Sequence, residues 1–229
     1  MKKINWSEIN TVLLDMDGTL LDLHYDTQFW QVQVPERYAR NHGLDITIAK
    51  QQLAPLFDKH IGTLNWYCLD FWSQALELDI VEMKREAAHL IAIKEGALLF
   101  LNQLKQSGKR TVLVTNAHPG SLALKLEHTQ LDNHLDHIIS AHELGLPKES
   151  PLFWGKLQEI EDYQPEQTLL VDDNLHALRT AREFGIRHLL AACHPDSQQP
   201  PRHTDEFPTF HHFDEITSGA NSICQYCHP

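Results

Sequence analysis

The sequence has few cysteines, no long apolar run and a shortage of basic residues. Its four cysteines are scattered over 229 residues, which is too few for a disulfide framework and is typical of reduced thiols. No segment approaches the roughly 18 consecutive apolar residues of a membrane-spanning helix. Polar residues such as Asn5 and Ser7 follow Met1, where a secretion signal would have its apolar core. We therefore expect a cytoplasmic protein with no membrane partner.

The shortage of positive charge excludes a further class of function. The chain has 19 Lys and Arg against 31 Asp and Glu, which gives a net charge of −12. A surface with this charge repels polyanions, so a bound anion needs local cations or backbone donors. We expect no nucleic acid partner. The rest of the composition, with 42% hydrophobic and 22% charged residues, is that of an ordinary folded protein.

Short apolar runs alternate with helical patterns along most of the chain. The runs cover 11–14, 110–115, 137–140, 168–171 and 188–192, and the helical patterns cover 97–106, 120–128, 151–160 and 175–184. We expect Ser150 to cap the helix that starts at Pro151. The alternation predicts an α/β protein with a doubly wound parallel sheet, whose ligand site lies at the carboxyl ends of the strands.

A long insert interrupts this alternation after the first run. Residues 23–94 have helical periodicity and no convincing strand, and Gly43 and Gly62 divide them into about four helices. The clearest of these helices cover 26–41 and 64–78. We expect a discontinuous core domain of residues 1–22 and 95–215, a helical cap of residues 23–94 and a flexible tail of residues 216–229.

Side chains suited to phosphate and metal chemistry stand just after a predicted strand or near a predicted helix start. They are Asp15 and Asp17, Thr115 and Asn116, Lys148, and Asp172 and Asp173. Because a parallel sheet gathers the carboxyl ends of its strands, these side chains are expected to converge on one small volume. Paired hard carboxylates suit Mg²⁺, while the hydroxyl, backbone N–H and ammonium groups can hold phosphate oxygens.

These four elements and the helical insert resemble the haloacid dehalogenase superfamily, whose members are mostly phosphatases with a Rossmann-like core. The resemblance covers about residues 8–192, and the motifs occur in the superfamily's order. One departure is Asp172-Asp173, where many members have Gly-Asp. The second carboxylate of the first motif, Asp17, is similar to that of the hydrolytic phosphatases and favours phosphate-ester hydrolysis.

The resemblance implies a role for each of these residues. Asp15 would be the nucleophile that forms an aspartyl-phosphate, and Asp17 would protonate the leaving oxygen and then deprotonate the attacking water. The Asp15 carboxylate, the Asp17 backbone carbonyl and Asp173 would hold a Mg²⁺ cofactor, with Asp172 acting through water or behind these ligands. Lys148 and Thr115 would neutralise and orient the transferring phosphoryl group.

The substrate is expected to be recognised by the cap, which contains Trp30, Trp66 and Trp72. Aromatic residues at helical spacing pack a cap core more often than they bind a ligand, yet a flat ring is also what a purine stacks on. The strings 63–72, 115–119 and 125–129 resemble those of bacterial 5′-nucleotidases that act on GMP and IMP. We therefore predict base or ribose contacts for Trp30, Asn65, Trp66 and Asp70, and phosphate contacts for Asn116.

The sequence thus predicts a Mg²⁺-dependent phosphatase for purine nucleoside 5′-monophosphates such as GMP and IMP. An alternative keeps this mechanism for a small phosphate ester such as phosphoglycolate or a sugar phosphate. A third interpretation, a catalytically idle binding protein on the same fold, is disfavoured because Asp15, Asp17, Lys148 and Asp173 are all present.

The C-terminal string Cys224-Gln225-Tyr226-Cys227-His228 matches a pattern for covalent haem attachment. That chemistry needs export and a surrounding pocket, and neither is indicated here. Cys224, Cys227 and His228 are also possible ligands of zinc or nickel. The default interpretation is a disordered tail that carries two thiols.

Overall fold

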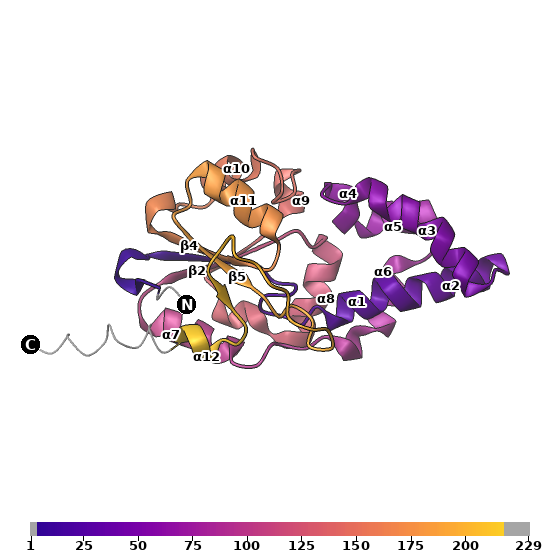
Figure 1. Cartoon of the computed structure of the whole chain (residues 1–229), viewed down its shortest axis with the longest axis horizontal. Helices are drawn as coiled ribbons and strands as arrows, with labels where there is room; N and C mark the ends of the chain where they lie inside the picture. Colours follow the sequence, from indigo (N-terminus) through magenta and orange to yellow (C-terminus); the bar gives the residue numbers. More distant parts are fainter. Residues whose placement is uncertain (1–3, 218–229) are drawn as a thin grey trace, which may run out of the picture.

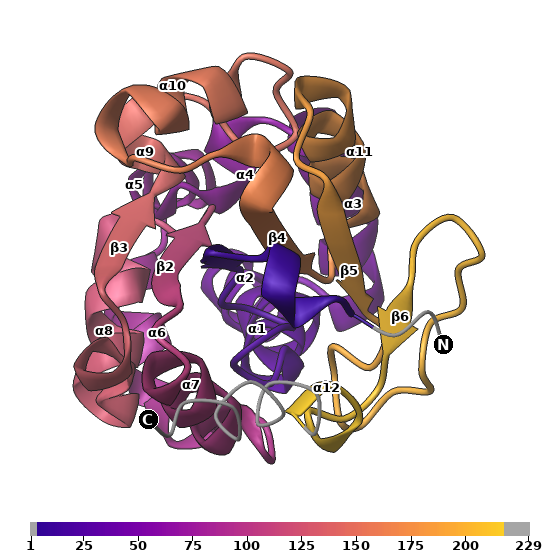
Figure 2. The same cartoon turned by 90° about the vertical axis from the view of Figure 1, so that its left-hand side faces the viewer.

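Parallel strands form the central sheet of the computed structural model, which describes residues 4–217. Within these residues the sheet has six strands in the order β3-β2-β1-β4-β5-β6, as Figure 2 shows. The strands are β1 (Thr11–Leu14), β2 (Arg110–Thr115), β3 (His137–Ser140), β4 (Thr168–Asp172), β5 (His188–Ala192) and β6 (Thr209–Phe210). The predicted α/β fold with a doubly wound parallel sheet is confirmed.

Helices cover both faces of the sheet, which is why its strands are apolar without interruption. Val12 and Leu14 of β1 pack into one hydrophobic cluster with α7 (Ala97–Gln106), α8 (Pro119–Thr129) and α12 (Asp214–Thr217). Leu13 points to the opposite face and packs into a second cluster with α9 (Ala141–Leu144), α10 (Phe153–Ile160) and α11 (Leu175–Phe184). Short 3-10 turns complete the core at Trp6–Glu8, Leu131–His134 and Pro165–Gln167.

The stretch between β1 and α7 is helical, as predicted, and lies to the right of the sheet in Figure 1. Its elements are α1 (His24–Gln28), a π-helical segment (Phe29–Gln33), α2 (Val34–His42), α3 (Ile46–His60), α4 (Leu64–Tyr67), α5 (Leu69–Leu76), α6 (Ile80–Glu86) and a 3-10 turn (Ala88–Leu90). The apolar cluster that contains Leu14 continues into this stretch through Phe29 and Trp72. The cap and one face of the sheet therefore share one apolar cluster. The predicted domain boundaries stay a prediction.

Two local predictions need correction. The predicted helix 64–78 is two helices, because Cys68 is extended and its Sγ accepts the N–H of Phe71 as the N-cap of α5. Ser150 does not cap α10, which begins at Phe153 after Leu152. In addition, β6 was not predicted, since it has only two residues and follows a polar stretch.

The chain ends bear on two further expectations. Ile216 and Thr217 belong to α12 and are buried, although the predicted tail begins at residue 216. The predictions for Cys224, Cys227 and His228 lie outside the described residues. Between residues 4 and 217, no helix has the length and apolar character needed to span a bilayer.

A buried carboxylate ties together the starts of two neighbouring strands. Glu161 is 2% exposed, and it accepts hydrogen bonds from Arg110 Nη2 at 2.9 Å and from His137 Nδ1 at 2.6 Å. Burial alone would raise the pKa of Glu161, but these hydrogen bonds and charges outweigh burial and lower it. A carboxyl with a lowered pKa stabilises the fold above its unfolded pKa and loses that contribution as the pH falls through its folded pKa.

We expect Glu161→Gln to lower the free energy of unfolding at neutral pH by about 2 kcal/mol, because hydrogen bonds to a buried charge are lost. The difference from the wild type should shrink as the pH falls below about 4, because the unfolded chain is then protonated and the folded carboxyl follows at lower pH. Urea denaturation at neutral pH and again below about pH 4 measures both effects. Glu159→Gln changes an exposed residue near the end of α10, two positions before Glu161, and is the matched control, with an expected change below about 0.5 kcal/mol. Equal losses for both variants would contradict the assignment.

Candidate active site

A buried lysine joins two carboxylates at the carboxyl ends of β1 and β4. Lys148 Nζ lies 2.5 Å from Asp15 Oδ1 and 2.7 Å from Asp172 Oδ2. The lysine backbone is fixed from both sides, because its N–H donates to Asn116 Oδ1 and its carbonyl accepts from Thr180 Oγ1. The cation that the sequence predicted near this point is therefore paired with both carboxylates.

Strand register places the carboxylates side by side. Leu14 pairs with Val171 across β1 and β4, so Asp15 and Asp172 end adjacent strands, and Asp173 follows at once. Gly18 lets the loop after β1 pass close to this point: it has φ +88°, and a Cβ there would lie 2.8 Å from Oδ2 of Asp173. A larger residue at position 18 would collide with the carboxylate cluster.

Burial governs the protonation of this cluster. It raises the pKa of Asp15 to about 7 and that of Asp172 to about 6, although the Lys148 charge opposes the rise. The pKa of Asp173 is raised to about 7 by burial and by the charge of Asp15. Burial would lower the pKa of Lys148, but the two carboxylates outweigh it, so the pKa is raised and the lysine stays charged.

The donor set fits a hard divalent cation. Carboxylate oxygens of Asp15, Asp172 and Asp173 lie within 4.8 Å of one another, and Asp15 Oδ2 is buried without a hydrogen-bond partner among the described residues. Oxygens of Asp172 already accept from Lys148 and from the N–H of Asn174. Among residues 4–217, Asp173 accepts only from the exposed Arg202, at 3.1 Å. Asp15 and Asp173 are therefore better placed than Asp172 to bind a cation such as Mg²⁺ directly.

A second buried ionic network surrounds Asp17 and was not predicted from the sequence. Lys125 Nζ of α8 donates to Asp17 Oδ1 at 2.6 Å and to Asp26 Oδ2 at 2.7 Å, and Lys84 of α6 donates to the other oxygen of Asp26. Burial and the Asp26 charge raise the pKa of Asp17, while Lys125 opposes the rise. The network therefore connects the loop after β1 to two cap helices.

Glu149 makes a further connection between the cap and the core that the sequence analysis missed. Tyr67 of α4 donates to Glu149 Oε1 at 2.6 Å, and Asn174 donates to the same oxygen at 2.8 Å. Asn116 Nδ2 donates to Glu149 Oε2 at 2.9 Å. The predicted phosphate contact, Asn116, is thus already engaged through its amide oxygen and its amide nitrogen.

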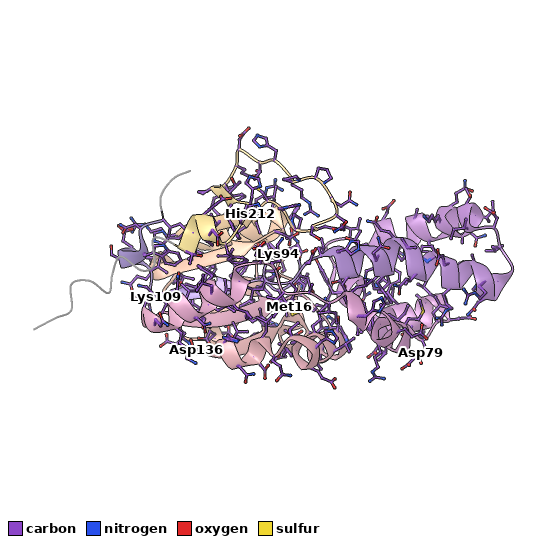
Figure 3. The ribbon with its side chains drawn as sticks, turned by 90° about the horizontal axis from the view of Figure 1, so that it is seen from below. Met16, Asp79, Lys94, Lys109, Asp136 and His212 are labelled. Atoms are coloured by element: carbon purple, nitrogen blue, oxygen red, sulfur yellow. The ribbon has the colours of Figure 1, made fainter. Side chains whose placement is uncertain are left out.

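A cavity of 710 Å³ lies over both ionic networks and reaches the cap helices. Figure 3 labels Met16, the neighbour of Asp15, near the middle of the molecule, and Asp79 at the start of α6 on the cap side. The lining includes Thr115 and Asn116 from the core and the rings of Trp30 and Trp66 from the cap. The volume of the cavity is within the size range of small-molecule sites.

The other cap residues considered in the sequence, Trp72, Asn65 and Asp70, do not line the cavity. Trp72 is 1% exposed and donates from Nε1 to the carbonyl of Trp66, so it packs the cap core. Asn65 and Asp70 are exposed, and the lining of the cavity contains neither. Their predicted contacts with the base or ribose therefore gain no support from the cavity.

Comparison with known proteins agrees with this geometry. A family profile described as haloacid dehalogenase-like hydrolase matches residues 9–185. The chain belongs to the haloacid dehalogenase-like hydrolase family, and it is an enzyme. The resemblance seen in the four motifs is confirmed.

Individual relatives are similar over most of the chain. The GMP/IMP nucleotidase YrfG of Escherichia coli strain K12 is 46% identical over 194 residues, which cover 85% of this chain and 87% of that protein. Glyceraldehyde 3-phosphate phosphatase of Pyrococcus furiosus is 26% identical over 192 residues, which cover 78% and 79%. The crystal structure of an HAD phosphatase from Thermococcus onnurineus has a TM-score of 0.75 at 18% identity and covers 92% of this chain and 97% of that chain, which supports the same fold.

We expect Asp173→Asn to raise the Mg²⁺ concentration needed for half-maximal activity by about 10-fold or more, because it removes charge from an oxygen available to the cation. Asp172→Asn should chiefly lower the melting temperature, because it leaves Lys148 with one carboxylate partner. Mg²⁺ titrations of turnover and thermal melts of both variants separate the two effects. The reverse ranking of Mg²⁺ requirement would make Asp172 the direct ligand.

Proposed function

We propose that this phosphoric monoester hydrolase acts on purine nucleoside 5′-monophosphates, with GMP and IMP preferred. The observation that carries the proposal is the composition of one cavity: its floor holds Asp15 and Lys148, and its cap side holds the rings of Trp30 and Trp66. The floor suits a phosphate ester and the rings suit a flat base. The similarity to the GMP/IMP nucleotidase of E. coli supports the same substrate class.

In the proposed mechanism, an oxygen of Asp15 attacks phosphorus, a bond to phosphorus forms, and the bond from phosphorus to the ester oxygen breaks. Asp17 gives its proton to the leaving oxygen, which departs as the nucleoside 5′-hydroxyl. Water then attacks the aspartyl-phosphate, Asp17 takes a proton from it, and phosphate and free Asp15 result. The raised pKa of Asp17 suits a group that must hold a proton at the start.

The other residues orient the phosphoryl group and offset its charge. Asp15, the backbone carbonyl of Asp17 and Asp173 would hold Mg²⁺, which supplies positive charge to the phosphoryl oxygens when bound. Lys148 neutralises charge that builds up in the transition state. Thr115 and Asn116 line the same end of the cavity, where hydroxyl and backbone groups can position the phosphate oxygens.

Base selectivity requires hydrogen bonds in addition to stacking, because every purine can stack on Trp30 or Trp66. Asp58, an exposed residue of α3, carries a carboxylate on the cap side of the cavity lining. A carboxylate can accept the N1–H that hypoxanthine and guanine have and adenine lacks. We therefore propose Asp58 as the residue that favours IMP and GMP over AMP, through a hydrogen bond that the bound base would cover.

We expect a panel of phosphate esters to rank IMP and GMP above AMP, with pyrimidine nucleotides, sugar phosphates and phosphoglycolate far below. Trp66→Ala should lower kcat/KM for IMP by about 10-fold or more through lost stacking, and spare a small artificial ester that does not reach the cap. Trp66→Phe retains an aromatic ring and is the matched control, and Asp15→Asn should be inactive on every ester.

Particular outcomes of this panel would overturn the proposal. Comparable wild-type rates on phosphoglycolate and IMP would favour the small-ester alternative, in line with the similarity to the P. furiosus phosphatase. Full activity of Asp15→Asn would refute the mechanism. Equal losses of Trp66→Ala on both kinds of ester, with a lowered melting temperature, would assign Trp66 to cap packing.

We expect Lys125→Met to move the alkaline limb of the kcat/KM profile to higher pH by about one unit, because a cation that holds down the pKa of Asp17 is lost. Protonated Asp17 would then persist to higher pH, and the proposed reaction needs that form. Lys105→Met, at an exposed position of α7, is the control and should leave the limb in place. A limb that stays in place, or moves to lower pH, in a folded Lys125→Met protein would contradict the role of Asp17 as the acid.

A further inference from the structure

Three side chains with soft or borderline metal-ligand atoms meet where the cap contacts the core. Cys68 lies between α4 and α5 of the cap, His118 is the N-cap of α8, and His142 belongs to α9. The Cys68 Sγ and one ring nitrogen from each histidine all lie within 4.8 Å of one another. This cluster is made of other residues than the carboxylate cluster and has a different donor chemistry.

One ring nitrogen of His142 is unpaired among the described residues. Its Nε2 is buried and makes no hydrogen bond with any described residue, and an unpaired buried polar atom is costly. Burial, together with the charge of His118, lowers the pKa of His142. A lowered pKa favours the neutral ring, which is the form that binds metals.

Cys68 presents its sulfur at the first turn of α5, where Sγ accepts the N–H of Phe71 at 3.4 Å. The side chain is neither fully buried nor fully exposed. When a metal ion binds, the thiol proton leaves Sγ for the buffer and the sulfur donates its electron pair to the metal.

We propose that Cys68, His118 and His142 form a binding site for Zn²⁺ or a similar divalent metal that prefers sulfur and nitrogen ligands. Zn²⁺ lies about 2.3 Å from sulfur and about 2.0–2.1 Å from nitrogen, so its tetrahedral ligands are about 3.5 Å apart. The three ligand atoms lie within 4.8 Å of one another, so their separations must shorten by at most about 1.3 Å to reach this spacing. Mg²⁺ prefers oxygen ligands and is expected at the carboxylates instead.

The surroundings of His118 affect how it binds. Its Nδ1 accepts the N–H of Gly120 at 3.2 Å, and its Nε2 lies 3.6 Å from Asp70 Oδ2. A neutral imidazole has only one ring nitrogen with a lone pair in the ring plane, and in His118 this lone pair accepts the N–H of Gly120. Metal binding needs the same lone pair, so the hydrogen bond with Gly120 is lost. One neutral hydrogen bond is weak compared with a shared metal ion. Asp70, which was predicted to contact the base or ribose, can instead orient this ring or complete the metal coordination.

The location of the site gives it a consequence for turnover. Cys68 is on the cap, whereas both histidines are on the core, and His118 also lines the cavity. A metal bound by all three side chains fixes the cap to the core at the rim of the cavity. Bound Zn²⁺ is therefore expected to slow nucleotide turnover by opposing cap opening.

A Co²⁺ titration of the full-length chain tests the site, because a sulfur ligand gives cobalt a charge-transfer band in the near ultraviolet. The titration uses a Cys224→Ser/Cys227→Ser background, which removes the tail thiols, and excess Mg²⁺, which occupies the carboxylates. We expect one Co²⁺ per chain with this band, no band after Cys68→Ser, and at least about 10-fold weaker binding after His142→Gln. Cys193→Ser, at a buried cysteine of the core, is the matched control and should retain the band.

Several outcomes would overturn the site or its consequence. A band that persists after Cys68→Ser, or no band in the background protein, would show that these residues do not bind the metal. Because this readout needs no substrate, it stands apart from the proposed nucleotidase activity. Zn²⁺ should also inhibit phosphate release in the background protein at least about 10-fold more strongly than in its Cys68→Ser derivative. Equal inhibition in both would place the inhibitory zinc at the carboxylates and refute the cap-bridging role.

Discussion

The bridge from Lys148 to Asp15 and Asp172 is the interaction on which the active site depends. Bringing three charges out of water is costly, and it is tolerated only where the charges pair closely and their remaining hydrogen bonds are made. Here the lysine is buried with both carboxylates, its backbone is held by Asn116 and Thr180, and Asp172 accepts the N–H of Asn174. Adjacent parallel strands make this possible, because their register delivers both carboxylates to one edge of the sheet.

The cap is connected to this centre by charge as well as by apolar packing. Lys125 and Lys84 converge on Asp26 beside Asp17, and Tyr67 reaches Glu149 beside Lys148. Each connection joins a cap residue to a group next to the proposed catalytic carboxylates. Movement of the cap would therefore change the local charge around Asp17, so binding energy from a base in the cap can affect the chemical step and not only affinity. This coupling gives a physical reason for a cap on a core that already holds the catalytic carboxylates.

The sequence predicted what local patterns encode. The first five strands were visible as apolar runs, and residues such as Asp15 and Asp172 could be placed because they stand immediately after such runs. Side-chain pairs that form only through three-dimensional packing could not be predicted. Lys125 and Asp17 are 108 positions apart, and a helical pattern does not indicate which lysine points inward. The same limit explains why Glu149 was not predicted as a site residue, although its neighbour Lys148 was found through its motif. The cap aromatics illustrate a further limit, since Trp66 and Trp72 share one stretch, yet one lines the cavity and the other packs the cap core.

Asp172 is where this chain departs from the Gly-Asp pattern seen in many members of the superfamily, and its contacts supply a reason for the difference. With glycine at this position, Lys148 would keep Asp15 as its only carboxylate partner, and the ammonium group would be tied to the nucleophile. Asp172 shares the ammonium group at 2.7 Å. A lysine held by two carboxylates can turn toward an incoming phosphoryl group and still have a negatively charged partner, because Asp172 stays in place. The extra carboxylate also adds negative charge beside Asp15, which favours binding of a cation before a phosphate anion can approach. The departure therefore ties phosphate binding more closely to metal binding than a glycine would.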